Sequence, residues 1–89
     1  MEVRIRYLGY DIAELFGSQK KREVLQLSDN ATYRELLGLL EKKYGKAESK
    51  EEMADNFFFI CGGKPLNTIG DELINPETEV MIAHKVFGG

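Results

Sequence analysis

The sequence has a single cysteine, Cys61, in a chain of 89 residues. One cysteine excludes an intramolecular disulfide, an all-cysteine iron–sulfur cluster and a thiolate zinc site built by one chain. A reducing compartment agrees with this usage. Packing as a small apolar side chain is the better-supported role for Cys61, because it follows directly on an aromatic run.

Long hydrophobic runs and an excess of positive charge are also absent. No apolar stretch approaches the ~20 residues that a bilayer span requires, and the sequence opens on "MEVRIRYL" without the pattern of a signal peptide. We therefore expect a cytoplasmic protein that does not enter a membrane. Fifteen acidic and twelve basic residues give a net charge of −3, which does not favour nucleic acid as a partner.

Alternation and short apolar runs predict the strands. "EVRIRYL" (Glu2–Leu8) alternates apolar and polar residues, and "REVLQLS" (Arg22–Ser28) does so again after a polar connection. "FFFIC" (Phe57–Cys61) is continuously apolar, which is typical of a mid-sheet strand covered on both faces. "KPLN" predicts a short edge strand because Pro65 lacks a ladder donor. "EVMIAHKVF" (Glu79–Phe87) predicts the last strand.

One long helix is predicted between the second and third of these strands. Its apolar residues share one face, and they are Tyr33, Leu36, Leu37, Leu40 and Tyr44. Thr32 and Glu35 have the spacing of a capping box, and Gly45 suits the position after the last turn. A shorter helix is expected over "YDIAELFG", with Asp11 as its N-cap. The charged segment "KAESKEEMADN" reads as a solvated connection with at most one helical turn.

These elements predict an α+β domain. A single amphipathic helix must bury its apolar stripe against one face of the sheet. The first and last strands can then lie side by side in the middle, which is the ubiquitin-like β-grasp arrangement with a mixed sheet of four to five strands. We expect this domain to span residues 1–87 and residues 88–89 to form a flexible tail.

The final residues, "HKVFGG", raise a chemical question. Two explanations remain open from the residues alone: a frayed terminus of arbitrary sequence, or a tail selected for its chemistry. Glycines without Cβ atoms can enter a narrow channel in extended form, and a terminal Gly89 carboxylate is sterically unhindered. Such a carboxylate is inert until it is activated. The stretch "CGGKP" lacks the spacing of a phosphate-binding loop, so a separate ATP-using enzyme would have to activate it.

The sequence resembles the ubiquitin-like sulfur carriers of the MoaD, ThiS and small archaeal modifier protein group. The similarity lies in "YDIAELFGSQ", in "ATYRELLGLLEKKYG" as the grasping helix, and in "EVMIAHKVFGG" as the last strand and tail. The sequence has His84 and Lys85 where MoaD-like chains commonly carry two prolines, and "INPETEV" where a Gly-Asp-Glu-Val turn is usual.

The resemblance implies a carrier and no catalytic or metal site of its own. A MoeB- or ThiF-type enzyme, using ATP and Mg²⁺, would adenylate Gly89. Sulfur would then give a thiocarboxylate for sulfur transfer, for example with a molybdopterin synthase large subunit. The alternative is a protein modifier joined through Gly89 to lysines of target proteins, and the third is a plain interaction module. Genome neighbours encoding that large subunit would favour the carrier.

The last strand also suggests a docking surface. If Val80 and Ile82 face the helix, Met81 lies on the open face of the sheet. We expect Met81 and Phe58 to dock a partner, and Val86, Phe87 and Gly88 to enter that partner as the tail. His84 is read as a surface residue, because one histidine without a second histidine or a cysteine partner makes a poor metal site.

Overall fold

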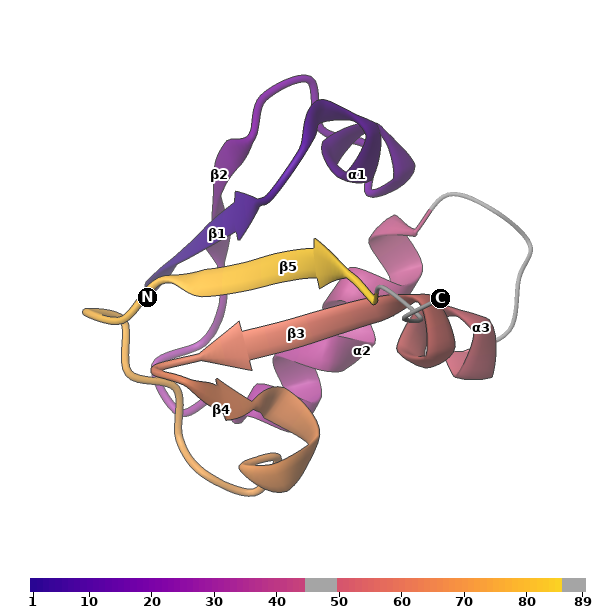
Figure 1. Cartoon of the computed structure of the whole chain (residues 1–89). Helices are drawn as coiled ribbons and strands as arrows, with labels where there is room; N and C mark the ends of the chain where they lie inside the picture. The colour runs from indigo at the N-terminus through magenta and orange to yellow at the C-terminus, as the bar shows by residue number, and fades with distance from the viewer. Residues whose placement is uncertain (45–49, 86–89) are drawn as a thin grey trace.

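Two strands from opposite ends of the chain lie at the centre of a five-stranded mixed sheet. The computed structural model describes residues 1–44 and 50–85. Its strands follow the spatial order β2-β1-β5-β3-β4 (Figure 1). They are β1 (Glu2–Tyr7), β2 (Arg22–Gln26), β3 (Phe57–Cys61), β4 (Lys64–Pro65) and β5 (Val80–His84). The central β1 and β5 run parallel, and the other neighbours are antiparallel, as the β-grasp prediction requires.

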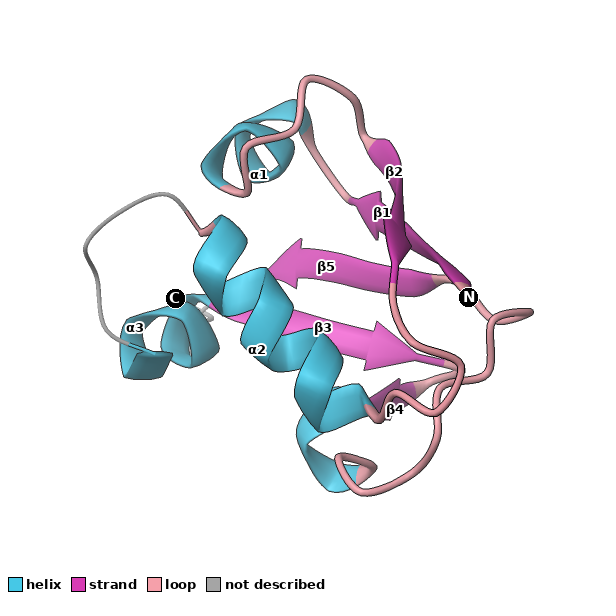
Figure 2. Cartoon of the chain, turned by 180° about the vertical axis from the view of Figure 1, so that it is seen from behind, coloured by secondary structure: helices cyan, strands magenta, loops and turns pink. Residues whose placement is uncertain are grey.

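The long helix α2 (Tyr33–Lys43) crosses one face of this sheet (Figure 2). Thr32 is its N-cap and accepts a hydrogen bond from the Glu35 backbone N–H at 3.3 Å. Half of the predicted capping box is therefore present. The Glu35 carboxylate accepts from the Thr32 hydroxyl at 3.4 Å instead of from a backbone N–H. The predicted stop at Gly45 lies outside the described residues.

The core lies between α2 and the sheet, with Phe16 at the centre of an aromatic cluster. Phe16 follows the short helix α1 (Tyr10–Leu15) and is fully buried. Its ring centroid lies 5.2 to 6.1 Å from those of Tyr44, Phe57, Tyr7 and Phe59. Cys61 is buried as predicted, and its Sγ lies 3.4 Å from the Tyr33 hydroxyl. That hydroxyl accepts from the Asn75 backbone N–H, and burial raises the pKa of Tyr33.

Two local predictions were wrong. The charged segment before β3, predicted to be a connection with at most one helical turn, contains the seven-residue helix α3 (Lys50–Asn56). Its Met53 is buried in the core, and this one apolar anchor fixes the helix against β3. Asp11 is not the N-cap of α1, because the helix begins at Tyr10, two residues earlier than such a cap would place it, and Gly9 takes the N-cap position. The Asp11 side chain is instead free to bond elsewhere.

A tight hairpin and a short helical turn complete the β3 edge of the sheet. Gly62 and Gly63 form the two-residue loop between Cys61 and Lys64, both with positive φ as such a loop requires. After β4 the chain leaves the sheet in the 3₁₀ turn η1 (Leu66–Thr68). Within the described ranges, no helix has the length and apolar character needed to cross a bilayer.

Candidate functional site

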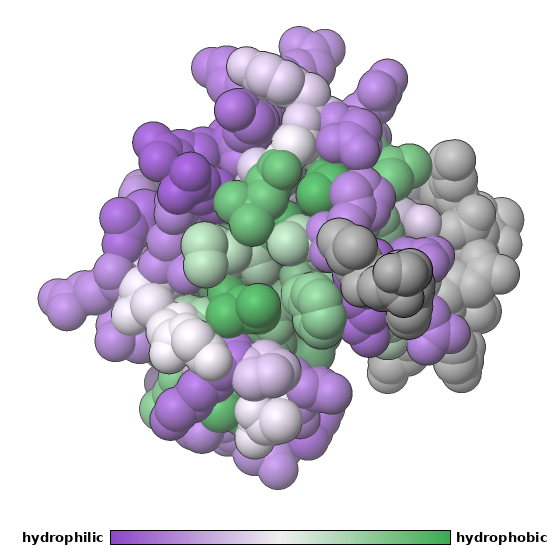
Figure 3. Space-filling view, in the orientation of Figure 1, coloured by the Kyte–Doolittle hydropathy of each residue, from purple (hydrophilic) through white to green (hydrophobic). Residues whose placement is uncertain are grey.

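An apolar patch occupies the face of the sheet that α2 leaves open. Four residues of the central strands form it, and we call them the open-face patch: Phe58, Ile60, Met81 and Ala83. Phe58 pairs with Ala83 and Ile60 pairs with Met81, so the four side chains adjoin across β3 and β5. Figure 3 shows hydrophobic surface gathered over these strands with hydrophilic surface around it.

The exposure of Phe58 contradicts one prediction and agrees with another. Its side chain is 45% exposed, so β3 is covered on one face only and not on both. The prediction was correct for the helix side of β3, where Phe57 and Phe59 are buried, and wrong for the opposite side, where Phe58 is exposed. The same exposure puts Phe58 beside half-buried Met81 on one surface, where the sequence predicted both to lie. A large apolar side chain left exposed in this way is available for contact with another molecule.

Positive charge flanks the open-face patch. On β1, Arg4 and Arg6 are exposed on the open face, and Arg6 is directly opposite Met81 in the parallel ladder. The Arg4 guanidinium donates to the Glu77 carbonyl. At the other side, the Lys85 ammonium lies 5.3 Å from the centroid of the Phe58 ring. An apolar centre with a basic rim suits a partner surface that is apolar and acidic.

His84 anchors the end of β5, immediately before the tail. Its Nε2–H donates to Oδ2 of Asp11 at 2.9 Å, and its ring stacks on Phe57 with centroids 5.1 Å apart. The hydrogen bond from His84 is the main cause that lowers the pKa of the exposed Asp11 carboxyl. The predicted surface position of His84 is confirmed, and the contact with Asp11 ties α1 to the strand from which the tail leaves.

The lowered pKa of Asp11 gives a test of this contact. A lowered pKa means that the ionised carboxylate stabilises the native state above the ordinary aspartate pKa, and that this contribution is lost as pH falls through the lowered value. We expect His84→Ala to move the NMR titration midpoint of Asp11 upward, toward the ordinary value. Lys64→Ala removes a charge at the opposite end of the sheet and should leave the midpoint in place. An unchanged midpoint in His84→Ala would mean that the bond does not persist in solution.

The remaining predicted site residues are the tail. Val86, Phe87, Gly88 and Gly89 lie outside the described residues, as does the boundary between the predicted domain and tail. β5 ends at His84, and Lys85 is the last described residue. Its backbone N–H donates to the Asn56 carbonyl at 3.0 Å, which extends the pairing with the β3 side of the sheet by one residue. Lys85, the last described residue, is therefore held beside β3 and lies close to Phe58 of the open-face patch.

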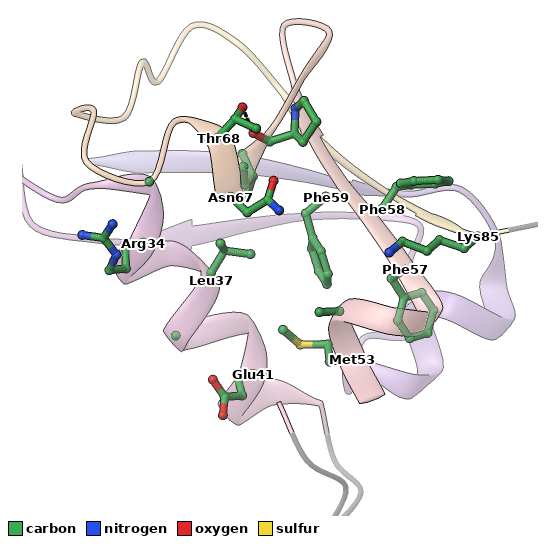
Figure 4. A pocket seen from close by; sticks show the side chains of 15 residues that line it. Arg34, Leu37, Glu41, Met53, Phe57, Phe58, Phe59, Asn67, Thr68 and Lys85 are labelled. Carbon is green, nitrogen blue, oxygen red and sulfur yellow. Dashed lines mark hydrogen bonds between the residues drawn. The ribbon is translucent and has the colours of Figure 1, made fainter. Parts of the chain in front are cut away.

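A groove beside β3 was not predicted from the sequence. It has a volume of about 590 Å³ and lies between α2, α3, β3 and η1 (Figure 4). The α2 wall consists of Arg34, Leu37, Gly38 and Glu41. Their spacing of i, i+3, i+4 and i+7 marks a helix face that shares Leu37 with the predicted core stripe, and this spacing was the signal that could have revealed the groove. The described residues contain no cluster of three or more side chains suited to hold a metal ion.

Comparisons with known proteins identify the fold. No protein-family model matches the sequence, and no curated protein matches it significantly. Several solved structures match over almost the whole chain, and three of them are described here. A Pyrococcus furiosus protein assigned as molybdopterin converting factor subunit 1 has a TM-score of 0.65 at 16% identity, covering 97% of this chain and 99% of that one.

Two further similar structures come from Haloferax volcanii. SAMP1 has a TM-score of 0.68 at 19% identity and covers 100% of both chains. The HVO 2177 protein has a TM-score of 0.66 at 21% identity, covering 100% of this chain and 87% of that chain. At these identities the likeness is one of fold. The chain thus has the ubiquitin-like β-grasp fold, similar to that of molybdopterin converting factor subunit 1 and of the small archaeal modifier protein SAMP1.

Proposed function

We propose that the chain is a ubiquitin-like sulfur carrier whose Gly89 carboxyl group is activated by a separate enzyme. A carboxylate oxygen of Gly89 attacks the α-phosphate of ATP, and pyrophosphate leaves. The resulting acyl-adenylate loses AMP to a sulfur nucleophile, which leaves a C-terminal thiocarboxylate for transfer to an acceptor such as a molybdopterin precursor. ATP and Mg²⁺ belong to the activating enzyme, of the MoeB or ThiF type, and this chain supplies only the acyl group.

The observation that carries the proposal is the combination of this fold with Gly88 and Gly89, which follow the end of the last strand by four and five residues in the sequence. The similar structures include a protein assigned to molybdopterin converting factor and a protein modifier. In this chain His84 and Lys85 fix the end of β5, and the sequence then supplies two apolar residues and two glycines. Such an end can extend from a rigid domain into the narrow site of another protein.

A second function fits the same parts. If a lysine amine attacks the activated acyl group, AMP or a thiol leaves and an isopeptide bond joins Gly89 to a target protein. Similarity to SAMP1 favours this role as much as similarity to the molybdopterin converting factor subunit favours the first, since their TM-scores are 0.68 and 0.65. The leading and the second function therefore differ only in the nucleophile that receives the acyl group.

Mass spectrometry of the protein from its native cells separates the two functions. N-terminally tagged protein is recovered and digested, beside a version without Gly88 and Gly89. Free protein with one oxygen replaced by sulfur at Gly89 supports the carrier. Peptides in which Gly89 is joined to lysines of other proteins support the modifier, and they rule against the carrier only if no sulfur exchange is found at Gly89 beside them. Absence of both, with the activating enzyme present, would leave only an interaction module.

The open-face patch is the surface we assign to the activating or sulfur-accepting partner. Met81→Asp puts a charge into the middle of the patch, beside Ile60 and opposite Arg6. We expect the protein concentration for half-maximal ATP-dependent modification in native cell extract to rise at least ~10-fold, the loss typical of a central interface residue. Met81 is half-buried and faces away from α2, so the melting temperature should stay nearly unchanged.

Leu73→Asp is the matched control, because Leu73 is 63% exposed and lies outside the patch. It likewise replaces an apolar side chain with a carboxylate and should leave modification unaffected. If Met81→Asp unfolds the protein, Met81 belongs to the core and the docking assignment is wrong. If the folded variant is modified as well as the wild type, the partner uses another surface.

A further inference from the structure

The outer edge of β3 is only partly paired. β4 pairs with Ile60 and Cys61 and then ends, so within the described ranges Phe57, Phe58 and Phe59 have no strand beside them on that side. The bond from the Lys85 N–H to the Asn56 carbonyl sets the phase of the antiparallel ladder with β5. Because hydrogen-bonded positions alternate along an antiparallel ladder, the backbone N–H and C=O groups of Phe58 and Ile60 hydrogen-bond to β5. The backbone N–H and C=O of Phe59 therefore point outward, away from β5. An edge of this kind can pair with another extended chain.

The groove lies along this unpaired edge. Phe57, Phe58 and Phe59 contribute to its lining, Leu66 to Thr68 close one end, and Met53 comes from α3. Leu37, Phe59 and Met53 face one another across it (Figure 4). Its volume of about 590 Å³ lies within the range of ligand-binding clefts. Space for apolar side chains therefore adjoins free backbone groups.

Gly38 keeps the α2 wall of the groove open. It lies within the helix, where glycine costs about 1 kcal/mol relative to alanine. A Cβ built at Gly38 meets no atom within 4 Å, so the core does not require a glycine there. Any larger side chain at this position would project into the space between α2 and β3. The free space at a helix-interior glycine is a second observation, independent of the strand edge, that points to an occupant.

The side chains that suit a strand added beside β3 follow from the two faces of the sheet, because successive residues of a strand point to opposite faces. Residues directly opposite each other on paired strands point to the same face. A residue opposite Phe58 would thus face the open side, where the Lys85 ammonium lies over the Phe58 ring and has no carboxylate partner among the described residues. Residues opposite Phe57 and Phe59 would point into the apolar groove. Glu41 is on the α2 wall and disfavours an acidic side chain on that inner side.

We propose that β3 accepts an extended segment of a partner protein as an added strand, with an apolar, acidic, apolar sequence opposite Phe57 to Phe59. The backbone of the segment bonds to Phe59, its two apolar side chains enter the groove, and its acidic side chain pairs with Lys85. This site requires neither Gly89 nor an activating enzyme, so it is a binding surface beyond the proposed carrier function. Its test likewise does not depend on that function.

The probe is a capped octapeptide whose central residues are valine, glutamate and valine, flanked by threonines. Binding to isotope-labelled full-length protein is followed by NMR. We expect saturable shifts at Phe59 and Gly38, a dissociation constant in the millimolar range or below, and slower hydrogen exchange of the Phe59 amide, which exchanges faster than the amides of Phe58 and Ile60 in the free protein. A peptide with both valine amides N-methylated keeps every side chain but cannot pair as a strand, and should not bind.

Variants make the test specific. Gly38→Leu fills the groove and should weaken binding at least tenfold, whereas Gly38→Ala, which is small and favours the helix, should bind within threefold of the wild type. Lys85→Glu should weaken binding of the glutamate peptide and strengthen binding of a peptide that carries lysine at that position.

Three results would overturn the proposal: no shift at Phe59 with 1 mM peptide, equal binding by the N-methylated peptide, or equal binding by folded Gly38→Leu.

Two other occupants of the groove are tested in parallel. A dimer in sedimentation that Gly38→Leu dissociates would assign the edge to a second copy of the chain. Deletion of residues 86–89 that shifts the groove resonances would assign it to the chain's own tail. Either outcome would show that the proposed partner segment is wrong.

Discussion

Deleting Gly88 and Gly89 is expected to reduce ATP-dependent modification of the protein to background while leaving its melting temperature within about 2 °C of the wild type. The deletion removes the only carboxylate that the proposed activation uses and leaves a bulky Phe87 at the end of the chain. Glycine has no side chain to bury, so the domain should lose little stability. Modification is measured as the fraction of protein changed in mass after incubation with native cell extract and ATP, and melting by circular dichroism.

Two controls separate the carboxylate from the rest of the tail. Appending one lysine after Gly89 keeps both glycines but moves the carboxylate, and should also abolish modification. Gly88→Ala keeps the Gly89 carboxylate in place and should retain part of the activity, because only one methyl group is added to the tail. A fall in melting temperature of more than about 5 °C on deletion would mean that the tail stabilises the domain, and the proposed role would lose its basis.

Phe16→Ala is expected to destabilise the domain by about 3–5 kcal/mol. Phe16 is fully buried and its ring contacts four other aromatic rings, so truncation leaves a cavity that these rigid rings cannot fill. A domain of this size has a free energy of unfolding of about 5–13 kcal/mol in total. The variant should therefore unfold at a much lower urea concentration, measured from the midpoint and slope of the transition.

Phe58→Ala makes the same chemical change at an exposed site. Phe58 is 45% exposed and lies on the open face, so the expected loss is about 1 kcal/mol or less. Equal losses in the two variants would contradict the assignment of Phe16 as the centre of the core and of Phe58 as a surface residue. The comparison also tests which face of the sheet is covered, on which the docking assignment depends.

Regular patterns in the sequence predicted most of the fold. Alternation in β1 and the helical stripe of α2 depend on neighbours along the chain, and both report directly which face is buried. Thr32 predicted the start of α2 because an N-cap bonds to the backbone within the next turn. The central pairing of β1 with β5 followed from the need to cover a single helix with one sheet.

What the sequence did not predict depends on contacts between distant segments. α3 has a charged sequence, and it is held by Met53, which is buried in a core to which α2 and β3 both contribute. Asp11 was assigned to a local cap, whereas its partner His84 lies 73 residues away. The groove arises because β4 ends at Pro65 and turns into η1, which leaves part of β3 unpaired. Gly89 lies outside the described residues, and its proposed chemistry is inferred from the sequence together with the fold.

The most direct test of the central claim is to trap the activated Gly89 carboxyl group. Tagged protein is incubated with extract of its native cells, ATP, Mg²⁺ and hydroxylamine, which attacks an activated acyl carbon and displaces AMP or a thiol. The proposed function predicts that the C-terminal peptide is recovered as the Gly89 hydroxamate only when ATP is present. Recovery of the free carboxylate both with and without ATP, from an extract that activates a known ubiquitin-like protein in the same tube, would contradict it.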